Sequence, residues 1–224
     1  MIKPTAAAAK LNSEVGRTAR KEVRRQQLID ATITSISKYG ITGTTTPKVT
    51  SLAGLSAGTV NFHFQTKQSL LEETLRHLGQ EHHAQWQKSV NNADLDPAAK
   101  LLAIVDAHFH PTICNRKKLT VWFAFYGEAA NREAYRAIMS EMDGQRIEIS
   151  IGLCRRIVEE GGYERIAPEE ISATLEALYD GFCLNILIYP KIFTRQDAMR
   201  RVRAYLAATF PQHAATFDPQ LLED

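Results

Sequence analysis

The chain has 224 residues, of which 44% are hydrophobic, enough to bury a sizeable core and to exclude disorder throughout. Its formal net charge of +2 is unevenly distributed, because residues 1–77 hold 11 Lys and Arg against 5 Asp and Glu, and the remaining 147 residues hold 16 against 20. The first part therefore carries +6 and the rest −4, so a polyanion such as DNA suits only the first part.

The N-terminal segment, residues 1–17, contains basic residues but lacks the apolar run of a secretory leader, and we expect a flexible arm. Three cysteines cannot all pair within one chain, which predicts reduced thiols and a cytoplasmic protein. We expect Cys154 and Cys183 to fill the core. The most apolar later segment, residues 171–190, carries Glu176 and Asp180, so a membrane span would be costly and we predict a soluble protein.

The first helices in chain order form a small domain. Apolar residues recur at helical spacing over residues 18–39, and Gly40 is a natural stop. Thr46 can cap a second helix that Gly54 ends, and Ser56 can cap a third that carries Val60 and Phe64. Two short helices around a three-residue turn that contains Gly are typical of a helix-turn-helix. The sequence therefore predicts a helix-turn-helix domain over residues 18–66.

The rest of the chain, residues 67–224, is predicted to be a larger helical domain. Expected helices are residues 67–90 with a cap at Thr66, then 97–110, 116–130, 131–160, a helix from Pro168, and a last one with the capping pair Thr194 and Asp197. No segment shows the alternation of a β-strand. The predicted fold class is therefore all-α.

Residues 104–111, "IVDAHFHP", contain the Asp-x-His-x-His order of some metal hydrolases. On a helix, however, His108 and His110 lie roughly 200° apart around the axis and cannot share an ion. Asp106 with His110 and Cys114 has better spacing, but Pro111 is expected to end or kink the helix between them. We therefore predict no metal site, no cofactor and no catalytic residue, and a metal-dependent hydrolase remains only the alternative.

Residues 44–71, "TTTPKVTSLAGLSAGTVNFHFQTKQSLL", carry the features Ala-Gly-Leu-Ser in the turn, Gly-Thr-Val in the next helix, and Lys67 with Leu70-Leu71 after it. In this register they resemble the DNA-binding domain of the TetR family of bacterial transcriptional regulators. The small residues at the start of the motif's second helix permit close approach to base edges. The resemblance implies that His63 and Lys67, which match family positions that usually contact phosphates, do so here, and Thr46 lies at a helix N-terminus suited to the same contact. The predicted DNA contacts are Thr46, Ser56, Ala57, Gly58, Thr59, Asn61, His63 and Lys67.

The TetR resemblance implies a variable body that binds a small ligand and forms a homodimer. The segment "VWFAFY" and its spacing from "LEALYDGFCLNI" are most similar to a choline-responsive repressor of this family, which implies a quaternary amine held by aromatic faces. The predicted ligand-binding residues are Trp86, Phe109, Trp122, Phe125, Tyr126, Tyr179 and Phe182.

The last helices carry apolar residues on more than one face, and a second apolar face needs a second partner. With the family resemblance, this predicts a homodimer through a four-helix contact that presents two recognition helices to a palindromic operator. The predicted protein is a ligand-responsive repressor and not an enzyme. A DNA-organising protein without a small ligand is the other alternative.

Overall fold

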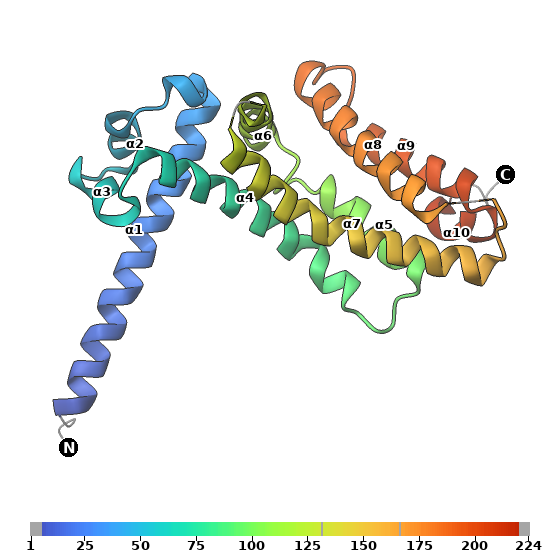
Figure 1. The fold of residues 1–224 in the computed structure, drawn as a ribbon, viewed down its shortest axis with the longest axis horizontal. Coiled ribbons are helices and arrows are strands. Elements are labelled where there is room, and N and C mark those ends of the chain that lie inside the picture. Colours follow the sequence, from blue (N-terminus) through green and yellow to red (C-terminus); the bar gives the residue numbers. More distant parts are fainter. Residues whose placement is uncertain (1–5, 131, 166, 220–224) are drawn as a thin grey trace. The chain divides into compact units, whose positions relative to one another are not determined.

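A computed structural model of the chain describes residues 6–130, 132–165 and 167–219, and these form helices and connecting turns without a β-strand (Figure 1). The predicted all-α fold class is confirmed. The elements are α1 (Ala6–Gly43), α2 (Thr46–Ala53), α3 (Gly58–Phe64), α4 (Lys67–Val90), α5 (Pro97–His108), α6 (Arg116–Ala129), α7 (Glu133–Gly161), α8 (Pro168–Ile188), α9 (Arg195–Thr209), the 3₁₀ turn η1 (Pro211–His213) and α10 (Ala214–Phe217).

The chain divides into two compact units, the first ending at Thr74 and the second beginning at Leu75. This division falls within α4, whereas the sequence-based boundary lies between Thr66 and Lys67, at the start of that helix. A long helix can supply its first turns to one core and the rest to another. The domain limits proposed from the sequence therefore stay a prediction.

Helix α1 differs from its prediction at both ends. It begins at Ala6, inside the segment expected as an arm, because a run of alanines has the highest helix propensity. Residues 1–5 of that arm lie outside the described residues, and its flexibility stays a prediction. At Gly40 the backbone turns to φ 69° and ψ 174°, a conformation open to glycine, and helical structure resumes up to Gly43.

The first unit buries apolar residues from α1, α2, α3 and the start of α4; they are Leu28, Ile36, Val49, Val60, Phe64 and Leu70. Arg25 of α1 completes this packing, since its guanidinium lies 4.6 Å from the centre of the Phe64 ring and pairs with Glu73. The contact ties the first helix to the end of α3. Tyr39 of α1 and Leu52 of α2 remain 49% and 41% exposed.

Two of the predicted caps are wrong by one residue. The N-cap of α2 is Thr45, whose side chain accepts from the Lys48 amide, and not Thr46. Helix α3 has Ala57 at its N-cap position without a side-chain cap, and the Ser56 hydroxyl bonds the Thr59 hydroxyl at 3.0 Å instead. The cap of α4 at Thr66 and the Thr194–Asp197 capping box of α9 are confirmed.

The second unit has its core where α5, α7, α8, α9 and α10 meet. Helix α7 packs against both α5 and α8, and α8 lies beside α9 (Figure 1). Helix α4 approaches α7 closely at Gly79, where an added Cβ would lie only 2.1 Å from the Met142 sulfur. Glycine at this position therefore allows the two helices to pack closely, because a larger side chain would collide with Met142.

Among the described residues, α8 alone has the length and hydropathy of a membrane-crossing helix. Its contacts are those of a helix packed in protein, since it lies against α6, α7 and α9 and buries Leu175, Tyr179 and Cys183. Glu176 on the same helix pairs with Arg146 of α7. Length and composition are therefore weak support for a membrane span here.

Candidate functional site

The first candidate surface is the helix-turn-helix formed by α2, a tight turn and α3. Gly54 ends α2 in the left-handed region, at φ 65° and ψ 34°, and its amide bonds the carbonyls of Thr50 and Ser51. The Leu55 amide also bonds the Thr50 carbonyl, at 2.9 Å. These bonds fix a short turn, so that α3 leaves α2 at a defined angle.

The predicted DNA contacts lie on this unit with different exposures. Ser56, Ala57, Gly58 and Asn61 are exposed, whereas Thr46, Thr59, His63 and Lys67 are half-buried. All eight belong to α2, the turn, α3 or the first residue of α4. Their contact with DNA stays a prediction.

Phe62 is a large apolar residue of α3 that lies on the surface. It is 74% exposed, because Val60 and Phe64 of the seven-residue α3 point inward and the residue between them points roughly the opposite way. The helical spacing of Val60 and Phe64 in the sequence already indicates that Phe62 lies on the opposite side of the helix. An exposed aromatic ring on a helix of this kind can contact the methyl group of thymine.

His63 follows Phe62 on α3 and lies in a positively charged environment. Burial, then the nearby charges of Lys21 and Arg25 on α1, lower the pKa of its imidazole. Its Nδ1 atom is buried and has no hydrogen-bond partner among the described residues. The neutral ring can therefore serve this surface as a hydrogen-bonding group rather than as a charge.

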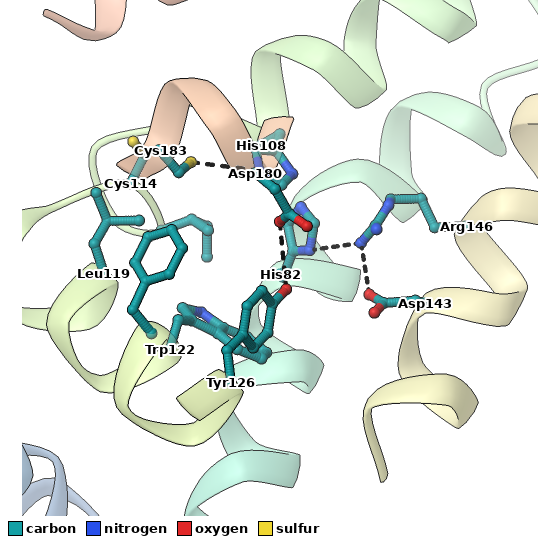
Figure 2. A pocket seen from close by; sticks show the side chains of 12 residues that line it. His82, His108, Cys114, Leu119, Trp122, Tyr126, Asp143, Arg146, Asp180 and Cys183 are labelled. Carbon is teal, nitrogen blue, oxygen red and sulfur yellow. Dashed lines mark hydrogen bonds and ion pairs between the residues drawn. The ribbon is translucent and has the colours of Figure 1, made fainter. Parts of the chain in front are cut away.

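The second candidate site is a cavity of about 50 Å³ in the second unit, large enough to admit water-sized molecules. Side chains from α4, the end of α5, the loop after it, α6, α7 and α8 converge on it (Figure 2). The described lining residues are His82, His108, Ile113, Cys114, Leu119, Trp122, Phe123, Tyr126, Asp143, Arg146, Asp180 and Cys183.

Arg146 is the one cationic side chain of this described lining and is 5% exposed. Its Nε donates to Glu176 at 3.1 Å and its Nη1 lies 3.1 Å from an oxygen of Asp143. Burial disfavours the charge, but Glu176 and Asp143 outweigh burial and hold the pKa of Arg146 above its ordinary value. The guanidinium therefore stays charged and fixes both carboxylates.

Two histidines form the inner wall of the cavity. The rings of His82 and His108 meet edge to face with centres 4.9 Å apart, and His108 stacks on Tyr179 at 4.3 Å. Burial, then Arg146 and His83, lower the pKa of His82 to about 3. Burial, then His82 and Arg146, lower the pKa of His108 well below its ordinary value. Both rings are therefore neutral near pH 7.

The protonated nitrogen of His82 follows from its contact with Arg146. Nη1 of Arg146 lies 3.4 Å from Nδ1 of His82, and a guanidinium can only donate, so Nδ1 accepts and Nε2 carries the proton. Nε2 is buried and has no partner among the described residues. His82 therefore offers the cavity wall an unused N–H donor.

At the more exposed end of the cavity, Tyr126 of α6 donates to Asp180 of α8 at 3.4 Å (Figure 2). Burial, then the neighbouring carboxylates of Glu176 and Asp143, raise the pKa of Asp180. The lining thus holds two carboxylates, Asp143 and Asp180, and Arg146 pairs with a third, Glu176. With both histidines neutral, this group of side chains carries an excess of negative charge beside the aromatic rings of Trp122, Phe123 and Tyr126.

The structure brings two of the seven predicted ligand residues, Trp122 and Tyr126, to the cavity lining. The others pack nearby in the second unit. Phe109 and Tyr179 contact each other behind His108, Phe125 packs on Tyr135, Trp86 on His83, and Phe182 on Phe193. Ligand contact by any of the seven stays a prediction.

Sequence reasoning missed most of the polar lining, namely His82, His108, Asp143, Arg146 and Asp180. They come from four helices that are far apart in the chain, and no local spacing joins them. The available signal was charge, because Glu176 and Asp180 stand in the most apolar segment of the chain, and a charged residue buried in protein needs a partner.

The metal alternative has no geometric support. Asp106 pairs with Arg203 at 2.7 Å, His108 is buried against Tyr179, and the His110 ring bonds the Thr112 hydroxyl at 2.8 Å. Within residues 6–130, 132–165 and 167–219, no group of three His, Cys, Asp or Glu side chains is arranged to hold a metal ion. The three residues face different neighbours.

Two family descriptions match the chain: "Bacterial regulatory proteins, tetR family" over residues 28–74, and "BetI-type transcriptional repressor, C-terminal" over residues 97–211. A relative named HTH-type transcriptional regulator BetI, from Paraburkholderia phymatum, is 31% identical over 195 residues, covering 87% of this chain and 97% of the relative.

Two solved structures share the fold. A transcriptional regulator from Pseudomonas aeruginosa PAO1 has a TM-score of 0.76 at 25% identity, covering 88% of this chain and 94% of that one. A regulator from Saccharomonospora viridis, in complex with choline, has a TM-score of 0.73 at 17% identity, covering 81% and 94%. The chain therefore belongs to the TetR family of bacterial transcriptional regulators, with a C-terminal domain of the BetI type, and is a regulator and not an enzyme.

Proposed function

We propose that the protein is a cytoplasmic, ligand-responsive repressor that binds a palindromic operator as a homodimer and is released by a small cation, a quaternary amine such as choline. The observation that carries the ligand class is the charge of the cavity in the second unit. Asp143 and Asp180 of the lining, with Glu176 that pairs with Arg146, outnumber this one cation, and three aromatic rings of the lining lie in the same cavity.

A quaternary ammonium group suits this environment for two reasons. It is attracted to the faces of aromatic rings, with about 0.5–2 kcal/mol for each favourable contact. It also compensates the carboxylates without donating a hydrogen bond, and its charge would favour the ionised form of Asp180, whose pKa is raised in the free protein. The solved regulator with choline is only 17% identical, so its likeness supports the fold and not the ligand.

A homodimer fits the apolar surface of α8 and the residues after it. Leu184, Ile188, Tyr189 and Ile192 are 40%, 53%, 52% and 80% exposed in the single chain. A second copy of the same surface would cover them, as the sequence predicts for its second apolar face. Two subunits would then present two α3 helices to symmetric half-sites.

Release by the ligand requires that it bind one conformation of the dimer better than the other. The Nε2–H of His82 and the carboxylates of Asp143 and Asp180 come from different helices, so a ligand that contacts them together favours one arrangement of those helices. Helix α4, which runs from Lys67 to His82 and beyond, connects the two units along the chain.

The test is thermal stabilisation of the purified protein by choline, compared with its uncharged isostere in which carbon replaces nitrogen. We expect choline alone to raise Tm, and to release a duplex drawn from the neighbourhood of the protein's own gene. Equal stabilisation by the isostere would contradict the charge argument. Stabilisation by no small molecule, with DNA binding intact, would favour the DNA-organising alternative.

A further inference from the structure

Cys114 and Cys183 are two thiols in the wall of the cavity that ligand binding, as proposed above, does not use. Cys114 lies in the loop between α5 and α6, and Cys183 lies on α8, 69 positions later in the chain. Both are free and line the same cavity, where Figure 2 shows their side chains next to one another. The third cysteine, Cys154, lies in the core of α7 and is absent from the described lining.

The two sulfur atoms have different surroundings. Sγ of Cys183 lies 3.6 Å from Nε2 of His108, whose neutral imidazole can accept a hydrogen bond from the thiol. Cys114 also borders a second, surface hollow of about 430 Å³, whose lining includes Arg116 and Arg195. The Cys183 thiol, and then the charge of Arg195, lower the pKa of Cys114 despite its burial, while contact with Cys114, then burial, raise that of Cys183.

We propose that Cys114 and Cys183 are a peroxide-sensitive pair that forms a reversible disulfide in the wall of the ligand cavity. In a reducing cytoplasm such a bond is transient, which is typical of redox-sensing cysteines. The bond would join the α5–α6 loop to α8 and remove the Cys183 proton that now faces His108.

The chemistry balances with hydrogen peroxide as the oxidant. The Cys114 thiolate attacks one peroxide oxygen, an S–O bond forms, the O–O bond breaks, and the departing hydroxide takes up a proton to leave as water. The Cys183 sulfur then attacks the sulfenic sulfur of Cys114, and its proton passes to the departing hydroxyl, which leaves as a second water. Two thiols and one peroxide thus give one disulfide and two waters.

The assignment of Cys114 as the first nucleophile follows from its place beside the arginine-lined hollow and from a pKa below its ordinary value. Cys154 provides an internal reference, because burial raises the pKa of its thiol to about 12 and it lies apart from the pair. The three cysteines of one chain should therefore respond unequally to the same oxidant.

The experiment uses the full-length reduced protein, treated with hydrogen peroxide, then denatured and alkylated, digested and analysed by mass spectrometry without reductant. We expect a peptide pair linked through Cys114 and Cys183 that separates on adding dithiothreitol, with Cys154 fully alkylated. Three results would overturn the proposal: both thiols alkylated after peroxide, linkage through Cys154, or irreversible oxidation without a link.

Three variants sharpen the result, each checked for folding by circular dichroism. Cys154→Ser should form the link as the wild type does. Cys183→Ser should stop at a sulfenic acid on Cys114 that reacts with dimedone, and Cys114→Ser should leave Cys183 alkylatable. If Cys183 in the Cys114→Ser protein formed a sulfenic acid as fast as Cys114 does, the assigned order would be wrong.

The effect on ligand binding rests on the proposed function and is measured separately, by titrating choline into the reduced and the oxidised protein. We expect oxidation to lower the affinity for choline, because the bond fixes two of the elements that line the cavity. A disulfide that forms without changing the affinity would overturn this coupling. A disulfide in a protein that ignores choline when reduced would refute the proposed ligand and leave the thiol chemistry standing.

Discussion

The two units place their functional side chains in opposite ways. In the first unit the candidate contacts point outward from a short helix, and Phe62 at 74% exposed is the extreme case. In the second unit they point inward, and Arg146 at 5% and His82 at 7% exposed are part of the packed interior. A change on the outer surface can therefore alter binding alone, whereas a change in the cavity alters binding and folding together.

Exposed and buried ion pairs differ in the same way. The exposed ion pair of Arg155 with Glu169 keeps both side chains more than half exposed, and such pairs contribute little to stability. Arg146 has its charge satisfied by Glu176 and Asp143 in the interior, where a lost partner leaves a buried carboxylate uncompensated. Five predictions test this contrast between outward and inward side chains.

The largest effect is expected for Arg146→Met. Removing the guanidinium leaves Glu176 partly buried and unpaired, which should lower the free energy of unfolding by about 3–5 kcal/mol. Urea denaturation measures it. The matched control is Arg155→Met, for which we expect about 0–1 kcal/mol. Equal losses in the two variants would contradict the contrast.

Acidification should destabilise the second unit through its buried histidines. The folded pKa of His82 is about 3 and the unfolded value is near 6.5, so the unfolded state binds the proton first and stability falls as pH falls below 6.5. For His82 alone the loss between pH 7 and pH 5 is about 2 kcal/mol. Urea denaturation across this range should show a shallower pH dependence in His82→Asn, and an unchanged slope would refute the assignment.

For the ligand, Trp122→Ala should weaken choline binding by about 0.5–2 kcal/mol, or roughly 2- to 30-fold, through loss of a cation–π contact. Isothermal titration calorimetry measures it, and Trp122→Phe should keep part of the affinity. Phe182→Ala is the comparison, because Phe182 packs on Phe193 outside the described lining. An equal loss in Phe182→Ala would place the ligand elsewhere.

Lys67→Ala and Thr59→Ala should change different properties of DNA binding. Removing the Lys67 charge, which is predicted to contact phosphate, should weaken binding to all sequences and reduce the salt slope by about 1, whereas Thr59→Ala should change sequence preference more than overall affinity. Fluorescence anisotropy on cognate and random duplexes at several salt concentrations separates the two. If both variants changed affinity and sequence preference in the same way, the assignment of Lys67 to phosphate and of Thr59 to base edges would be wrong.

The smallest effect on stability is expected for Phe62→Ala, within about 0.5 kcal/mol, because the ring is exposed. Phe64→Ala, two residues later and buried, should cost about 3–5 kcal/mol. If Phe62 reads a thymine methyl group, its loss should weaken binding to a cognate duplex while leaving random DNA unaffected. A large loss of stability would show that the ring is covered in solution.

The helices could be predicted well from the sequence because their signals are local. Gly54, Thr66 and the pair Thr194 and Asp197 mark helix ends through contacts within four residues. The errors at Thr46 and Ser56 are shifts of a single residue, of the size that cap positions usually carry. The resemblance to the TetR family could be found for the same reason, because it depends on residue types at fixed positions within the contiguous stretch 44–71.

The cavity could not be predicted in the same way, because its polar residues meet only after the second unit has packed. Arg146 reaches Glu176 from another helix, and His82 reaches His108 across 26 positions of sequence. The aromatic cluster at 122–126 was visible, but a helix turns only some of its residues to one side. Trp122 and Tyr126, four apart, face the cavity, while Phe125 faces Tyr135.

The tight approach at Gly79 couples α4 mechanically to α7. Met142 fills the space where a side chain would stand, and His82 of the cavity lies three residues further along α4. A ligand that displaces His82 and shifts α4 along α7 would therefore have to change the rotamer of Met142. This flexible side chain thus limits the movement of the two helices past each other.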